Sequence, residues 1–104
     1  MSTFVGNAGI TVAIKTFKHK GLKKFFESGI KRGLPAPMLK KIGMILDRLD
    51  AATETKDMNY PGSDFHPLEG NLKGFYSVHI NGNWTIIFRL SNGEATDVNL
   101  IDYH

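Results

Sequence analysis

The chain has 104 residues, of which 41% are hydrophobic, and a formal net charge of +3. This length is typical of one globular domain with a single hydrophobic core. The sequence contains no cysteine, which excludes disulfides, thiolate metal sites and cysteine nucleophiles. No stretch approaches the roughly 20 apolar residues of a membrane span, and residues 1–12 lack the order of a signal peptide. These features predict a cytoplasmic protein with no membrane contact.

Basic residues are concentrated in the first half of the chain. Residues 1–46 hold nine Lys or Arg and one acidic residue, Glu27, whereas residues 47–104 hold four basic and nine acidic residues. The first half therefore carries a net charge of about +8, and the second half about −5. Such a basic half can bind phosphates or an acidic partner segment, but lysines also form the solvated face of ordinary helices. Charge alone leaves both interpretations open.

The first predicted elements are a strand and two helices. Residues 10–17, ITVAIKTF, alternate in the manner of a strand, and the segment before them is expected to be loosely ordered. Helical spacing then starts at Leu22 and is expected to close at Gly33. The LPAP segment breaks this helix and begins a second one. The two apolar stripes consist of Leu22, Phe25, Phe26 and Ile30, and of Met38, Leu39, Ile42, Ile45, Leu46 and Leu49.

The second half of the chain alternates with the period of strands. A short extended piece, FHPL, precedes GFYSVHI and WTIIFRL, which a three-residue turn at 81–83 should join into a hairpin. A second turn at 92–93 leads to a last strand, ATDVNLI. We expect Trp84, Ile86, Phe88 and Leu90 to face the helices, and Thr85, Ile87 and Arg89 to lie on the opposite face. The predicted fold class is therefore α+β: an N-terminal strand, a two-helix hairpin, and an antiparallel β-meander with the helices on one face.

Histidines and the last residues of the chain are the candidate chemical groups. None of the four histidines has a metal-ligand spacing to another, so no metal site is predicted. His66 is held extended by the following Pro67, and the chain ends in Asp102, Tyr103 and His104. Two imidazoles and a carboxylate can serve as an acid and base set near neutral pH if the fold brings them together. A surface histidine and a frayed polar terminus are the alternatives.

Four stretches of the chain carry a resemblance to a known family: IKTFKHKGLKKFFESG, ILDRLDAATETKDM, HPLEGNLKGFYSVHINGNW and the terminal DYH. In collinear order they resemble the HigB-type toxins of the RelE/ParE superfamily, the toxin half of bacterial toxin-antitoxin pairs. The resemblance spans about Ala13 to His104. It implies that residues 1–12 are an N-terminal extension and that residues 13–104 form a compact RelE-like domain.

This resemblance implies a ribosome-dependent endoribonuclease that cuts translated messenger RNA. A HigA-type helix-turn-helix antitoxin would inhibit it, and operator DNA would be contacted only through that antitoxin. Cleavage in the family needs no metal and no cofactor, because one group activates the ribose 2′-hydroxyl and another protonates the leaving 5′-oxygen. Carried over to this sequence, His66 and His104 are the acid and base pair, Asp102 orients one of them, and Tyr103 contacts the RNA.

Three arginines expected from the resemblance are absent. Their positions hold Leu72, His79 and Thr85. Arginines that clamp a transition-state phosphate can be worth about 10² to 10³ in rate, if they act like oxyanion-hole donors. Partial replacement is expected from the phosphate-binding candidates Lys73, His79, Thr85, Lys18 and Lys20. The sequence therefore predicts a ribonuclease that is weaker than its relatives or altered in sequence preference.

Two other functions remain open at this point. The chain could keep the toxin fold and the antitoxin partner but lack cleavage, acting as a decoy or a corepressor. It could also be a ParE-like poison of DNA gyrase. The missing arginines favour the first alternative, and the terminal Asp102, Tyr103 and His104 speak against it. His66 together with those three residues speaks against the second.

Overall fold

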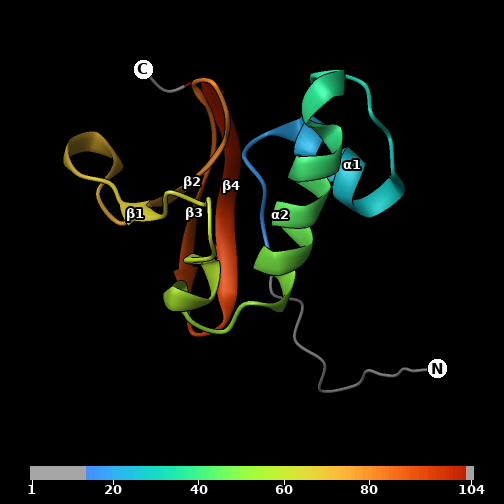
Figure 1. Cartoon of the computed structure of the whole chain (residues 1–104). Coiled ribbons are helices and arrows are strands. Elements are labelled where there is room, and N and C mark those ends of the chain that lie inside the picture. The colour runs from blue at the N-terminus through green and yellow to red at the C-terminus, as the bar shows by residue number, and fades with distance from the viewer. Residues whose placement is uncertain (1–13, 103–104) are drawn as a thin grey trace, which may run out of the picture.

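Two α-helices lie on one face of a four-stranded antiparallel sheet in the computed structural model, which describes residues 14–102 (Figure 1). A short turn that follows the first strand lies on the other side of the sheet (Figure 1). This arrangement confirms the α+β fold class and the expected position of the helices. Among the described helices, none has the length and apolar character that crossing a membrane requires.

Helix α1 comprises Lys20–Ser28 and ends earlier than the sequence pattern predicted. Gly29 follows it with φ 72°, a left-handed conformation that glycine adopts without steric cost. Its backbone N–H donates to the carbonyls of Lys24 and Phe25, which completes the last turn. The expected end at Gly33 was therefore wrong, and Ile30 lies beyond the helix with 46% of its surface exposed.

Helix α2 comprises Leu39–Ala51 and follows a 3₁₀ turn at Ala36–Met38. Its apolar stripe is buried as predicted, with Leu39 only partly buried at its start; the buried members are Met38, Ile42, Ile45, Leu46 and Leu49. Lys40 is exposed, whereas the ammonium group of Lys41 donates to the Ile80 carbonyl at 2.7 Å. This bond ties the helix directly to the sheet. A second 3₁₀ turn, Thr55–Met58, then leads away from the helix.

The sheet has the order β1-β2-β3-β4. Its strands are β1 (His66–Pro67), β2 (Tyr76–Asn81), β3 (Trp84–Ser91) and β4 (Glu94–Asp102), with a 3₁₀ turn at Gly70–Leu72 after β1. Asn92 and Gly93 join β3 to β4 with φ 55° and 76°, as a tight two-residue hairpin turn requires. The β2–β3 turn is one residue shorter than predicted, because Asn81 already pairs with Trp84.

Residues 14–17 run beside the outer edge of β4 but form two isolated parallel bridges rather than a regular strand. The remainder of the strand predicted there, residues 10–13, lies outside the described residues. Strand β4 carries one extra residue opposite β3 near Asp97, whose φ is 54°. The Asp97 N–H donates to the Thr16 hydroxyl at 2.8 Å. Because this bulge bends the edge, the N-terminal segment covers it without a continuous ladder.

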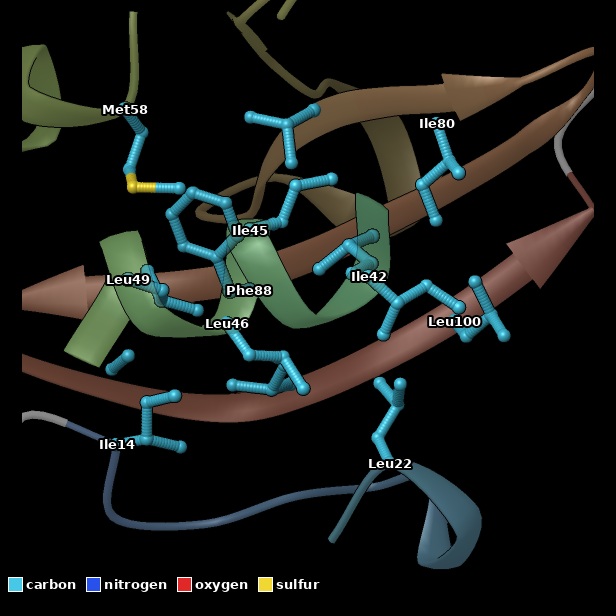
Figure 2. Close-up of a cluster of buried hydrophobic side chains, with 14 of the residues drawn as sticks. Ile14, Leu22, Ile42, Ile45, Leu46, Leu49, Met58, Ile80, Phe88 and Leu100 are labelled. Carbon is cyan, nitrogen blue, oxygen red and sulfur yellow. The ribbon is translucent and has the colours of Figure 1, made fainter. Parts of the chain in front are cut away.

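The main hydrophobic core lies between the helices and the sheet. Figure 2 shows Ile42, Ile45 and Leu46 of α2 beside Phe88 of β3, the largest of the fully buried side chains. Leu22 from α1 closes the same core and has no exposed surface. The prediction that Ile86, Phe88 and Leu90 face the helices is confirmed, and Trp84 packs at the margin.

The opposite face of the sheet carries a second, smaller hydrophobic cluster. Leu68, Phe75 and Ile87 are buried there, and Leu72 and Ile101 pack against them. The segment between β1 and β2 supplies most of this cluster, so it covers only part of the face. The uncovered part of this face holds polar side chains.

Candidate active site

Polar side chains of the uncovered sheet face line a cleft of about 290 Å³. The strand register brings four of them together, because His66 pairs with Ser77 and His79 pairs with Thr85. Ser77 and His79 are two residues apart on β2, so their side chains project to the same face. The described lining residues are Asp64, His66, Ser77, His79, Gly82 and Thr85. Three residues predicted for the site, His66, His79 and Thr85, therefore meet in one place.

The imidazole of His66 has a defined orientation in this cleft. Its Nδ1 lies 2.9 Å from the main-chain carbonyl oxygen of Asp64. A carbonyl only accepts hydrogen bonds, so Nδ1 carries a proton and donates it. The other nitrogen, Nε2, lies 3.5 Å from the Ser77 hydroxyl. In the neutral ring Nε2 is therefore the basic nitrogen, and it can take up and return a proton on the cleft side.

His79 and Thr85 form the part of the cleft next to the β2–β3 turn. The His79 Nε2–H donates to the Gly82 carbonyl at 2.8 Å, which leaves Nδ1 as the nitrogen free to accept. The Thr85 hydroxyl donates to the Asn83 carbonyl at 3.3 Å, a long bond that a better acceptor could replace. The Thr85 hydroxyl can thus donate to a phosphate, whereas His79 can do so only when its ring is charged and Nδ1 also carries a proton.

The cleft contains no Lys or Arg among its described lining residues. Leu72, which stands where the resemblance implies an arginine, packs against the second hydrophobic cluster instead. Lys73 directly follows it and is exposed, but it does not line the cleft. Within residues 14–102, no cluster of three or more His, Asp or Glu side chains is arranged to hold a metal ion. Hydrogen bonding and proton transfer are the chemistry that these lining groups offer.

Lys18 and Lys20 are not among the described residues that line this cleft. Lys18 donates its backbone N–H to Val98 at the outer edge of β4, whereas Lys20 is the first residue of α1. The expectation that they supply charge to the His66 site has no support in this geometry.

A second hollow of about 430 Å³ is formed around the ends of α1. It is lined by His19, Lys20, Gly21, Lys24, Ile30, Arg32 and Gly33. The positive charge and the exposed Ile30 suit an acidic or polyanionic partner. His19 also caps the helix, since its Nδ1 accepts the Leu22 N–H at 3.1 Å, and partial burial lowers the pKa of this imidazole below 6.5.

Asp102 ends β4 and pairs with Trp84. Residues that face each other across an antiparallel pair lie on the same side of the sheet, so the register puts Asp102 on the opposite side from His66. The acceptor that orients His66 is instead the Asp64 carbonyl. Tyr103 and His104 lie outside the described residues, so the pairing of His66 with His104 stays a prediction.

Sequence reasoning missed Asp64 and Ser77. Ser77 could have been found, because strand alternation in YSVHI places it on the same face as His79. Asp64 left no signal of this kind, since it contributes through its main-chain carbonyl.

A family model described as the RelE-like toxin of type II toxin-antitoxin system HigB matches residues 15–104. The chain belongs to this HigB toxin family. Membership implies an antitoxin as a partner. It also agrees with the resemblance noted in the sequence, from its first matched stretch to the terminal His104.

Individual HigB relatives match over most of their length. An endoribonuclease HigB from Proteus vulgaris is 43% identical over 91 residues, covering 88% of this chain and 99% of the relative. A toxin HigB-1 from Vibrio cholerae is 36% identical over 86 residues, covering 81% and 90%. A conserved hypothetical protein of Helicobacter pylori, whose structure was solved in solution, shares the fold with a TM-score of 0.50 and 18% identity. That structure aligns over 86% of this chain and 92% of its own.

Proposed function

We propose that this HigB-family chain is an endoribonuclease that cuts translated messenger RNA on the ribosome without a metal or a cofactor. The observation that carries the proposal is the His66 ring, whose Nδ1–H is held by the Asp64 carbonyl while Nε2 faces a polar cleft. The 43% identical relative from Proteus vulgaris, named an endoribonuclease, supports the same activity.

The proposed reaction is an internal transfer within RNA. A base removes the proton of a ribose 2′-hydroxyl, and the 2′-oxygen forms a bond to the adjacent phosphorus. The bond from phosphorus to the 5′-oxygen breaks, and an acid protonates that oxygen, which yields a cyclic phosphate and a 5′-hydroxyl. His66 and His104 are the proposed acid and base pair, with Asp102 orienting one of them. Tyr103 would stack on an unpaired base of the message.

This site offers fewer groups for binding phosphate than for transferring protons, because no Lys or Arg is among its described lining residues. The Thr85 hydroxyl could donate to a phosphate, and His79 could donate only with its ring charged, so neither gives the permanent charge of an arginine. We therefore expect slower cleavage than in relatives that carry arginines at these positions, by up to about 10² to 10³ for a lost clamp. The same feature favours a second candidate function, a toxin fold that binds its antitoxin and acts as a decoy or corepressor without cleaving RNA.

The proposed partners are a HigA-type antitoxin, the ribosome and its message in the bacterial cytoplasm, and operator DNA only through the antitoxin. The basic hollow beside α1 supports partners of negative charge, since Lys20, Lys24 and Arg32 converge there. Both an acidic antitoxin segment and ribosomal phosphates satisfy that requirement.

Replacing His66 or His104 by Gln tests the proposed activity. Each variant should lose about 10² to 10⁴ in cleavage rate, because one proton-transfer group is removed. Toeprinting of a translated message measures the cleavage, growth arrest gives a second measure, and antitoxin binding serves as a control for folding. Two variants as toxic as the parent chain would show that this cleft is not the active site.

The parent chain itself separates the remaining alternatives. If it binds the antitoxin but leaves translated messages intact, the decoy or corepressor function is correct. If it instead blocks gyrase supercoiling in a purified assay, the chain is a ParE-like poison.

A further inference from the structure

Asp64 has an unusual backbone conformation at the edge of the cleft. Its φ is 49°, and among the described residues only Asn92 and Asp97 share a positive φ without being glycine. Those two have structural reasons, because Asn92 forms the β3–β4 turn and Asp97 the bulge of β4. Asp64 lies in neither kind of feature. A left-handed residue is uncommon outside glycine, and such outliers often mark functional positions.

The conformation turns the Asp64 carbonyl toward the His66 ring. The carbonyl oxygen lies 2.9 Å from Nδ1, although only one residue separates the two along the chain. Contacts on both sides of Asp64 keep it in place. The carbonyl of the fully buried Ser63 accepts the His79 N–H at 2.8 Å, and the Phe65 ring stacks on Tyr76 with centroids 5.5 Å apart.

We infer that Asp64 is a positioning residue: its left-handed main chain fixes the His66 proton on Nδ1 and leaves Nε2 as the reacting nitrogen. The inference rests on the proposed ribonuclease function, whose base or acid is His66. Because the carbonyl accepts but cannot donate, Nδ1 keeps its proton in both the neutral and the charged ring. Nε2 can therefore gain a proton and release it while the ring stays still, with the Ser77 hydroxyl 3.5 Å away.

The main chain of Asp64, rather than its carboxylate, carries this role. The side chain is exposed, and the contact to His66 comes from the carbonyl oxygen. Asn and Gly adopt a positive φ readily, whereas β-branched residues such as Val resist it. D64G and D64N should therefore keep the orientation of His66, and D64V should lose it.

Nitrogen NMR of the full chain labelled with ¹⁵N reads the tautomer directly. In the parent chain, D64G and D64N, the neutral His66 ring should show a protonated Nδ1 and an unprotonated Nε2. In D64V the two tautomers should mix, and kcat for RNA cleavage should fall about tenfold with KM little changed, as for loss of other groups that orient a functional histidine.

Asn92→Val is the matched control. It imposes the same conflict at φ 55°, but in the β3–β4 turn rather than beside His66. This variant should lose thermal stability while keeping the parent tautomer of His66 and the parent kcat.

Two results would overturn the inference. One is a parent spectrum in which neutral His66 carries its proton on Nε2, a measurement that needs no variant to fold. The other is a D64V chain with the parent spectrum and parent kcat. A parent chain that shows the Nδ1 tautomer but cuts no RNA overturns the proposed ribonuclease function and, with it, the role of Asp64 in catalysis.

Discussion

The two faces of the sheet differ in what covers them. On one face α1 and α2 bury a continuous apolar core that includes Phe88 and Ile86, which have no exposed surface. On the other face a smaller cluster around Ile87 covers part of the sheet, and the rest forms the cleft with His66. Adjacent residues of β3 thus belong to opposite environments. A strand can stabilise the fold with every second side chain and present polar groups with the others.

The packed face of the sheet also keeps the cleft in its geometry. Main-chain bonds and strand pairing hold its side chains, as in the His66–Ser77 and His79–Thr85 pairs. The core on the far face fixes those strands without occupying the cleft. We therefore expect substitutions on the helix side to change stability first, and substitutions on the cleft side to change activity first.

Ile86 and Ile87 give the sharpest test of this difference between the two faces, because they are the same residue type and adjacent in the sequence. Ile86→Ala should lower the free energy of unfolding by about 4 kcal/mol, and Ile87→Ala by about 2 kcal/mol, both within the range of about 2 to 5 kcal/mol for such core changes. The smaller cluster can relax into the space that Ile87 leaves, whereas the dense helix-side core cannot. Urea denaturation measures both. Equal losses would show that the two clusters contribute alike.

Placing an arginine at position 85 or at position 72 should have different effects, because the first position lines the cleft and the second packs in the smaller hydrophobic cluster. Thr85→Arg should raise cleavage about tenfold, because a guanidinium adds charge and paired donors beside His79. Leu72→Arg should instead lower stability, since Leu72 packs against the second hydrophobic cluster. Cleavage rates and thermal melts of the two variants distinguish these outcomes. A Thr85→Arg chain no faster than the parent would mean that the cleft does not hold the phosphate at this position.

Titration of His19 should give the smallest effect and leave the cleft unaffected. Burial lowers the pKa of folded His19 below 6.5, so the folded chain binds this proton more weakly than the unfolded chain does. His19 thus contributes stability above pH 6.5, which is lost as the pH falls through the folded pKa. Protonation also removes the lone pair that caps α1.

His19→Asn keeps a capping side chain without a titrating group. Its stability should therefore vary less between pH 7 and pH 5 than that of the parent chain, as measured by urea midpoints. The same pH dependence in both chains would exclude His19 as its source.

Local patterns predicted most of the fold. The helical spacing of α2 and the alternation of β3 correctly identified the core side, because each depends only on neighbours along the chain. The ends of the helices and turns were predicted less accurately. Helix α1 ends at Gly29 rather than at Gly33. Both are glycines that can adopt a positive φ, so residue type does not tell which of them ends the helix.

The sequence predicted those parts of the candidate site that depend on side chains. His66, His79 and Thr85 were named from the sequence, and pairing of the strands brought them into one cleft. Lys18 and Lys20 were assigned to the same site on charge, but neither lines the cleft: Lys18 bonds to the outer edge of β4, and Lys20 begins α1. Charge counts along a chain contain no information about which side of a sheet a residue reaches.

The sequence by itself determined the fold class, the toxin family and the identity of the proton-transfer candidates, since these depend on residue type, spacing and order. Only the tertiary structure decided which nitrogen of His66 faces the cleft. That choice depends on the direction of one carbonyl group, at Asp64, and on strand pairing between residues distant in the chain. Hydrogen-bond direction is a property of the folded backbone, and amino-acid type does not specify it.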